Sequence, residues 1–300
     1  MDDERCKGAN DMQIIAGEHG VLGARIQGID LKSISSETVS EILAAVHRHA
    51  LVRFKGQSMS VYEYKVLGQT LGAIMPYPDE RYHHPEHPEV FVSSNVQSRT
   101  MGMARSGYFW HTDLAFKPKP QPLTLLYPQL LPQAKRETLF INMADVYDAL
   151  PAALRSIVDG RTAKHDPVLR YKVAQADVDA NLDLGEILER GRQMFPAPTH
   201  PLVITHPVSR RRILYMSSGF TTSIDGLPPD ESQAALKELF AFIERPEHVR
   251  AHSWELGDII IWDNRMLIHK AGYMAPGDYQ TIFRLGVDDL VPFYEGIAAA

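Results

Sequence analysis

Cysteine is almost absent from this chain of 300 residues, which contains Cys6 and no other. A single thiol cannot form an internal disulfide, and it leaves cysteine-based metal sites without their usual ligands. The sequence therefore favours a reducing compartment, and we expect a cytoplasmic protein. The charged, polar residues 1–11 predict a flexible N-terminal tail, followed by one domain over residues 12–300.

Long hydrophobic runs and an excess of positive charge are also lacking. No stretch approaches the roughly 18 apolar residues of a membrane-spanning helix, and residues 1–11 lack the apolar core of a signal peptide. The formal net charge of -6 gives no general attraction for nucleic acid or anionic membranes. We therefore expect a small-molecule acidic substrate that is bound by a local basic pocket. The sequence leaves the oligomeric state open, and a homo-oligomer is possible.

The chain has no internal repeat and no Gly-rich phosphate loop, and it consists largely of short apolar runs between turn residues. Helical periodicity is confined to residues 36–50, 61–71 and 230–244, and residues 50–56 have the pattern of a strand. Because strands and helices do not alternate regularly, the sequence predicts a mainly β barrel or sandwich with flanking helices, not a doubly wound parallel sheet.

The strongest local signal is GYFWHTDLAF, in which His111 and Asp113 are two residues apart. On an extended segment both side chains project to the same face. A converging imidazole and carboxylate supply two ligands of a two-histidine, one-carboxylate metal site, and His269 in IIIWDNRMLIHKAG is the candidate for the third. An HxD triplet alone is common by chance, but chance is a poor account of the ordered set that continues with Thr138, His269 and Arg284.

The ordered motifs resemble those of the taurine-dioxygenase-like family of iron(II)- and 2-oxoglutarate-dependent oxygenases. The resemblance extends from GVLGARIQGIDL through WHTDLAF, ETLFINMADVYDALP, THPVSRRRILYMSSGFT and GDIIIWDNRMLIHKAG to RLGV. It implies a double-stranded β-helix, or jelly roll, that uses Fe(II), 2-oxoglutarate and O2. It also implies that His111, Asp113 and His269 bind Fe(II), and that Thr138 and Arg284 bind the distal carboxylate of 2-oxoglutarate.

One departure from the family pattern concerns the arginines. Some relatives carry a second arginine four residues before the one matched by Arg284, whereas this chain has Gln280. Three possibilities therefore stay open for Arg284: it serves the co-substrate, the substrate, or a position between them. Arg136 is a candidate cation for either acid, and its structural alternative is a surface ion pair with Glu137.

Two further segments, PYPDERYHHPEHPEVFVSSN and KHDPVLRYKV, resemble the isonitrile-forming branch of this family. Members of this branch act on N-carboxymethyl β-amino acids, such as (R)-3-[(carboxymethyl)amino]butanoate or longer fatty-acid analogues. Two oxidation rounds and loss of CO2 then leave a β-isocyano acid. The two carboxylates of such a substrate need cationic or phenolic partners, and the candidates are Tyr77, Tyr82, Lys172 and Arg136.

Each of these candidates also has a purely structural interpretation. The tyrosines fit a role in the core or at a rim, and Lys172 fits an exposed strand edge. Two other functions also stay open. A hydroxylase or desaturase of another small amine, acid or sulfonate would share the iron site. A cupin-like protein would hold metal without turnover, but Thr138 and Arg284 argue against it, since a metal binder needs no clamp for a co-substrate.

Overall fold

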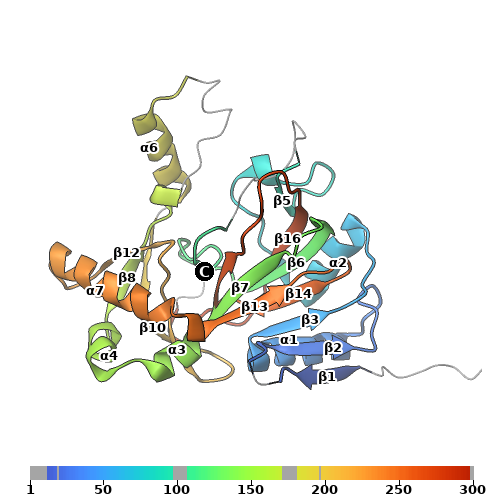
Figure 1. Cartoon of the computed structure of the whole chain (residues 1–300), viewed down its shortest axis with the longest axis horizontal. Helices are drawn as coiled ribbons and strands as arrows, with labels where there is room; N and C mark the ends of the chain where they lie inside the picture. Colours follow the sequence, from blue (N-terminus) through green and yellow to red (C-terminus); the bar gives the residue numbers. More distant parts are fainter. Residues whose placement is uncertain (1–11, 19, 97–106, 171–180, 196, 298–300) are drawn as a thin grey trace, which may run out of the picture.

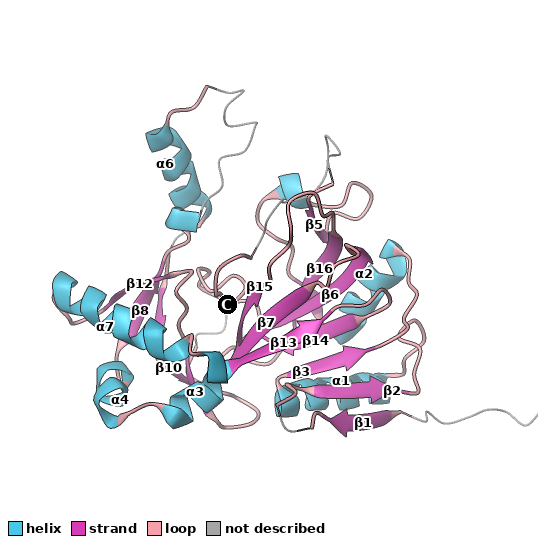
Figure 2. Ribbon diagram, in the orientation of Figure 1, coloured by secondary structure: helices cyan, strands magenta, loops and turns pink. Residues whose placement is uncertain are grey.

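Strands dominate the fold, as the sequence predicts, and they form the two main sheets of a jelly roll with helices on the outside (Figures 1 and 2). The structure is a computed structural model that describes residues 12–18, 20–96, 107–170, 181–195 and 197–297. The predicted tail and Lys172 lie outside the described residues. Within these ranges, no helix has the length and apolar character needed to cross a membrane.

The larger sheet has eight strands in the order β1-β2-β3-β14-β6-β16-β4, and β5 also pairs with β16. Neighbouring strands are antiparallel except β2 and β3, which are parallel. The strands are β1 (Gln13–Ala16), β2 (Ala24–Gln27), β3 (Leu51–Phe54), β4 (Ala73–Ile74), β5 (Phe91–Ser94), β6 (Leu123–Leu130), β14 (Ile259–Asp263) and β16 (Thr281–Asp288).

Two helices, both at positions that the sequence predicts, cover one face of this sheet (Figure 1). The helix α1 (Ser36–His49) begins after Ser35, whose hydroxyl accepts a hydrogen bond from the Thr38 backbone N–H. The helix α2 (Val61–Leu71) begins with a capping box between Ser60 and Glu63. These local signals explain why the sequence predicts both helices closely.

The smaller main sheet has the order β13-β7-β15, in which β7 is central. Two short sheets, β12-β8-β9 and β10-β11, extend the structure on the same side as the remaining helices (Figure 1). Their strands are β7 (Glu137–Asn142), β8 (Thr162–His165), β9 (Thr199–Pro201), β10 (Val203–Thr205), β11 (Arg212–Leu214), β12 (Thr221–Ile224), β13 (Val249–Ser253) and β15 (Leu267–Ala271).

The remaining helices differ in how well the sequence predicts them. The predicted helix over residues 230–244 is α7 (Pro229–Ile243), whereas three shorter helices were not predicted. One of the three, α6, carries a local sequence signal for a helix start, because it begins with a capping box between Asp183 and Glu186. The missed helices are α3 (Met143–Ala149), α4 (Ala152–Val158) and α6 (Leu184–Met194), and the 3-10 turns are η1 (Glu80–Tyr82), η2 (Val168–Arg170) and η3 (Pro246–His248).

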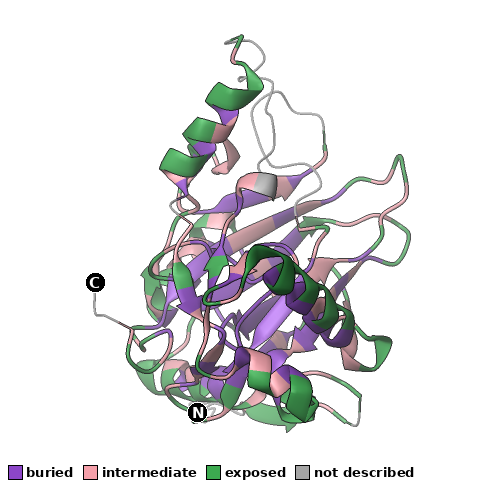
Figure 3. Cartoon of the chain, turned by 90° about the vertical axis from the view of Figure 1, so that its left-hand side faces the viewer, coloured by how far each residue is buried: buried purple, intermediate pink, exposed green. Residues whose placement is uncertain are grey.

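Buried apolar side chains form two clusters, and the central strand β14 contributes to both. Ile259 and Ile261 belong to the cluster under α1 and α2, whereas Ile260 and Trp262 belong to the cluster on the other face. Figure 3 shows buried residues along the strands and exposed residues on the outer faces of the helices. Successive side chains of β14 therefore point to opposite faces of the sheet and contribute to the two clusters in turn.

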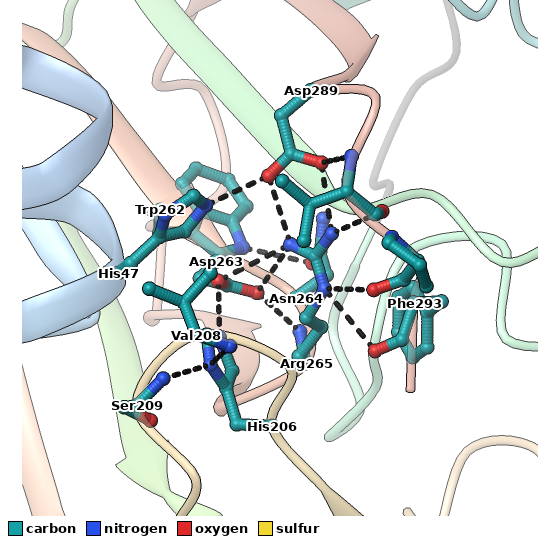
Figure 4. Close-up of polar contacts among 12 residues, drawn as sticks. His47, His206, Val208, Ser209, Trp262, Asp263, Asn264, Arg265, Asp289 and Phe293 are labelled. Atoms are coloured by element: carbon teal, nitrogen blue, oxygen red, sulfur yellow. Dashed lines mark hydrogen bonds and ion pairs between the residues drawn. The ribbon is translucent and has the colours of Figure 1, made fainter. Parts of the chain in front are cut away.

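Five charged or titratable side chains, which we call the buried ion cluster, tie distant segments together (Figure 4). The Arg265 guanidinium is 1% exposed and donates to Asp289 at 2.8 and 3.0 Å and to Asp263 at 3.3 Å. His47 of α1 contacts Asp289 at 2.8 Å, and His206 contacts Asp263 at 2.9 Å. The cluster therefore holds the turn between β14 and β15 from within.

Candidate iron and substrate site

The three predicted metal ligands meet at one place in the fold. The ligand atoms of His111, Asp113 and His269 all lie within 4.8 Å of one another. Nε2 of His111 is 3.8 Å from Oδ1 of Asp113, and Nε2 of His269 is 3.9 Å from Oδ2. All three residues are buried. Two imidazoles and one carboxylate that leave one side open form the donor set of non-haem Fe(II) oxygenases, so these residues fit iron(II).

A backbone bridge places the two histidines side by side. The His111 N–H donates to the His269 carbonyl at 3.0 Å, the reverse bond is 2.8 Å, and the ring centroids are 4.1 Å apart. The expectation of an extended segment is wrong for Asp113, which begins a turn over residues 113–116. Leu114 there has φ of 51°, a left-handed conformation that is costly for leucine. The turn, not strand alternation, places the carboxylate beside His111.

The three side chains are held in the protonation states that bind metal. Nδ1 of His111 lies 2.8 Å from the Phe109 carbonyl, which assigns the proton to Nδ1 and leaves Nε2 free. Burial lowers the pKa of His111, and it lowers the pKa of His269 to about 3. Burial opposes ionisation of Asp113, but Arg284 and the two imidazoles outweigh it and lower the Asp113 pKa to about 2. Neutral imidazoles and a carboxylate therefore face the open side at neutral pH.

The triad opens into a pocket that also contains every other predicted site residue that the structure describes. The lining includes Tyr77, Tyr82, Arg136, Thr138 and Arg284. Lys172 was predicted for the same pocket, but it lies outside the described residues. Residues from β6, β7, β15 and β16 thus meet the segment that carries η1, although they are far apart in the sequence.

Arg136 is a buried cation with neutral partners. It is 4% exposed, and it donates from Nε to the Gln280 side-chain oxygen at 2.5 Å and from Nη1 to the Gly272 carbonyl at 2.6 Å. Glu137, the partner considered for it, instead pairs with Lys135 at 2.6 Å. Burial lowers the Arg136 pKa. A buried cation without a carboxylate partner is costly, so this end of the pocket suits an anionic ligand.

Thr138 on β7 lies two residues after Arg136 and has a hydroxyl proton to offer. The Trp254 indole N–H, which can only donate, donates to the Thr138 hydroxyl oxygen at 2.9 Å. The hydroxyl proton is therefore left for a different acceptor. Together, Arg136 and Thr138 provide the donors that a carboxylate in this part of the pocket would need.

Arg284 directly contacts Asp113, one of the predicted metal ligands. Its Nη1 donates to Oδ1 of Asp113 at 2.6 Å, and its guanidinium lies 5.3 Å from the Tyr77 ring centroid and 4.4 Å from that of Phe91. The rings of Tyr77 and Tyr82 are 6.2 Å apart. Burial raises the Tyr77 pKa to about 12, so its phenol stays protonated and can donate. The structure thus groups Arg284 with the two tyrosines.

Among the residues that the structure describes, the charged side chains lining the pocket are four arginines and two aspartates, namely Arg81, Arg136, Arg170, Arg284, Asp79 and Asp113. Each aspartate has an arginine partner: Arg81 binds Asp79 through contacts of 2.8 and 3.1 Å, and Arg284 binds Asp113. Four positive and two negative charges leave an excess of two positive charges. The predicted local basic pocket is therefore present in a chain whose net charge is negative.

Arg170 also lines the pocket, although no sequence pattern in the segment KHDPVLRYKV predicted it as a site residue. Its guanidinium donates to the carbonyl oxygens of Ser218 and Gly219 at 3.3 Å and lies 4.7 Å from the centroid of the Phe109 ring. These acceptors are neutral. In the described part of the chain, Arg136 and Arg170 are thus the pocket arginines that lack a carboxylate partner.

An apolar wall completes the pocket beside His111. Phe116 contacts both Phe195 and Phe220 with ring centroids 4.9 Å apart, and Phe220 lies 6.0 Å from the His111 ring. Phe116 belongs to the GYFWHTDLAF segment, but no local pattern distinguishes Phe195 or Phe220 from ordinary core residues. The wall suits an apolar part of a ligand next to the metal ligands.

The chain is similar to known proteins over most of its length. A family model described as taurine catabolism dioxygenase TauD, TfdA family matches residues 15–285. An alpha-ketoglutarate-dependent sulfate ester dioxygenase from Pseudomonas putida is 29% identical over 267 residues, covering 87% of this chain and 83% of the relative. Pentalenolactone F synthase from Streptomyces arenae is 28% identical over 265 residues, covering 86% and 89%.

A solved structure shows the same similarity in three dimensions. The crystal structure of a taurine dioxygenase from Burkholderia xenovorans has a TM-score of 0.72 and 27% sequence identity to this chain. The alignment covers 92% of this chain and 90% of that structure. This likeness over nearly the whole chain confirms the jelly-roll prediction.

Proposed function

The chain belongs to the TauD/TfdA family and is an iron(II)- and 2-oxoglutarate-dependent dioxygenase, and from this premise we propose that it converts an N-carboxymethyl β-amino acid to the β-isocyano acid. The observation that carries the proposal is the excess of positive charge in the pocket. One arginine suffices for the distal carboxylate of 2-oxoglutarate, which leaves one unpaired positive charge for a carboxylate of the substrate. Lys172, together with the donors of Arg284, Tyr77 and Tyr82, would supply the partners for a second substrate carboxylate.

His111, Asp113 and His269 would hold the iron, which supplies O2 activation when it is bound with 2-oxoglutarate. We assign the distal carboxylate of 2-oxoglutarate to Arg136 and Thr138, because Arg136 is a buried cation with neutral partners. With this assignment Arg284 would bind the substrate, which is one of the alternatives that the sequence left open.

Arg284, Tyr77 and Tyr82 would bind the substrate carboxylates, with Lys172 as a further cation. Holding the glycine-derived CH2 beside the triad would expose it to oxidation in each of two rounds. The N–H and CH2 hydrogens leave during these rounds, and the C–C bond to the carboxylate breaks to release CO2. The aromatic wall would exclude water and accommodate the alkyl chain.

The deciding experiment supplies Fe(II), 2-oxoglutarate and O2 with a panel of N-carboxymethyl β-amino acids of increasing chain length, followed by mass spectrometry. Isonitrile formation together with succinate is the expected result. A hydroxylated or desaturated product from another small amine, acid or sulfonate, without isonitrile from any panel member, would favour the alternative oxygenase function.

Replacing Arg136 by methionine is expected to raise the 2-oxoglutarate concentration needed for half-maximal succinate formation by about tenfold or more, because a charge-assisted pair is lost. Replacing Arg284 by methionine should instead weaken substrate binding with a smaller effect on 2-oxoglutarate. Steady-state kinetics with each compound varied in turn would measure both. A larger effect of Arg284→Met than of Arg136→Met on the 2-oxoglutarate requirement would instead assign Arg284 to the distal carboxylate of 2-oxoglutarate.

Replacing Lys172 by methionine is expected to lower kcat/KM for the dianionic substrate by roughly ten- to a hundredfold, because the ammonium is lost while the apolar stem remains. Succinate formation without isonitrile should persist, since oxygen activation is assigned to other residues. Lys164→Met on β8 is a matched control, because Lys164 pairs with Asp166 at 3.7 Å and does not line the pocket. Unchanged isonitrile formation in Lys172→Met would remove Lys172 from the site.

A further inference from the structure

Thr124 on β6 is fully buried and lies behind the carboxylate of Asp113. Three side chains meet at its hydroxyl oxygen. The Gln121 amide nitrogen lies at 2.5 Å, the Asn264 amide nitrogen at 2.8 Å, and Oδ2 of Asp113 at 2.6 Å. A hydroxyl offers one proton and accepts through two lone pairs, so all of its hydrogen-bonding capacity is used here.

The direction of these hydrogen bonds follows from the donors around Thr124. The amide nitrogens of Gln121 and Asn264 use both lone pairs of the Thr124 oxygen, so the Thr124 proton is left for Oδ2 of Asp113. The Trp262 indole N–H can only donate, and it donates to Oδ1 of Asn264 at 2.9 Å (Figure 4). The Asn264 nitrogen must therefore face Thr124. Both observations give the same order of donors, from Trp262 through Asn264 and Thr124 to Asp113.

We call the hydrogen bonds from Trp262 through Asn264 and Thr124 to Asp113 the relay. The buried ion cluster holds Asn264 in place within this relay. Asp263 and Arg265, the neighbours of Asn264 in the sequence, both belong to the cluster (Figure 4). The Asn264 backbone N–H also donates to the Pro122 carbonyl at 2.8 Å, and the Asp263 N–H donates to the Ala50 carbonyl at 2.9 Å. Asn264 is consequently held from both sides and cannot turn away from Thr124 without breaking buried contacts.

We propose that Thr124, supported by Asn264, is a positioning residue that orients Asp113 for iron binding. Thr124 donates to Oδ2 and Arg284 donates to Oδ1, so the two contacts fix the plane of the carboxylate. In this orientation Oδ1 lies 3.8 Å from Nε2 of His111, and Oδ2 lies 3.9 Å from Nε2 of His269. The inference rests on the proposed iron site and adds two residues that touch neither metal nor substrate. Such outer partners typically alter metal affinity by about 10- to 100-fold.

The primary test compares Thr124→Val with Thr124→Ser in the full chain. Valine keeps the shape but removes the hydroxyl, and it is expected to weaken Mn(II) binding by about 10- to 100-fold in anaerobic calorimetry with 2-oxoglutarate present. Serine keeps the donor and should restore near wild-type affinity. Thr38→Val, which removes a buried hydroxyl in α1, is the control for general destabilisation and should leave Mn(II) affinity unchanged.

A second variant keeps the test decisive if Thr124→Val does not fold. Asn264→Ala removes the amide that directs the Thr124 proton, and it should also weaken Mn(II) binding. The double variant Thr124→Val/Asn264→Ala should bind Mn(II) only slightly more weakly than the weaker-binding single variant, because both changes interrupt one relay. Wild-type affinity in either folded variant would overturn the positioning role. A wild-type protein that binds no Mn(II) or Fe(II) would instead overturn the iron site itself.

Discussion

Replacing His111, Asp113 or His269 by alanine is expected to abolish Fe(II)-dependent succinate formation from 2-oxoglutarate. The candidate ligand atoms of these residues lie within 4.8 Å of one another, and each substitution removes one of the three proposed protein ligands. The variants should stay folded, because metal ligands on the open side of a pocket contribute little to the apolar core. Succinate release and iron stoichiometry would be measured on the same anaerobically loaded samples.

The matched control for the histidine substitutions is His248→Ala. His248 lies in η3, outside the pocket lining, and its Nδ1 contacts the Ile243 carbonyl at 3.1 Å. This variant should retain iron and turnover. Full activity with unchanged iron content in any one of the three ligand variants would refute the assignment of that ligand.

Replacing Arg265 by methionine is expected to destabilise the protein by about 3–5 kcal/mol, because it leaves two buried aspartates without their counter-ion. Asp263 and Arg265 are fully buried, and Arg265 binds Asp289, which lies 24 residues further along the chain. Denaturant unfolding at fixed metal concentration would measure the change as a shift of the midpoint. A loss below about 1 kcal/mol would show that the aspartates are neutralised in another way.

Two comparisons separate the charge effect from loss of packing. Adding Asp263→Asn and Asp289→Asn to Arg265→Met should recover part of the lost stability, because the unpaired charges are removed together. Arg210→Met disrupts an exposed pair with Glu295 at 3.0 Å and should produce a much smaller shift. If the triple variant recovered none of the stability lost in Arg265→Met, loss of guanidinium packing would be the larger contribution.

The sequence alone determined those features whose physical cause is local or whose spacing is diagnostic. Ser60 and Glu63 cap α2 within one turn, so the boundaries of that helix follow from neighbouring residues. His111, Asp113 and His269 could be chosen as ligands because their order matches a family motif, and the structure brings them together. The prediction of these three residues as ligands therefore needed no knowledge of the turn that positions Asp113.

Only the tertiary structure decided which partner each polar side chain has. Arg136 was considered for an ion pair with its neighbour Glu137, yet it bonds to Gln280 across the fold. Thr124 looks like any buried strand residue until Asn264, 140 positions away, supplies the amide that directs its proton. These contacts join residues far apart along the chain, and their geometry exists only after β6, β14 and β16 have paired. Local patterns encode how a segment folds, whereas the chemistry of this pocket depends on which segments the sheets bring together.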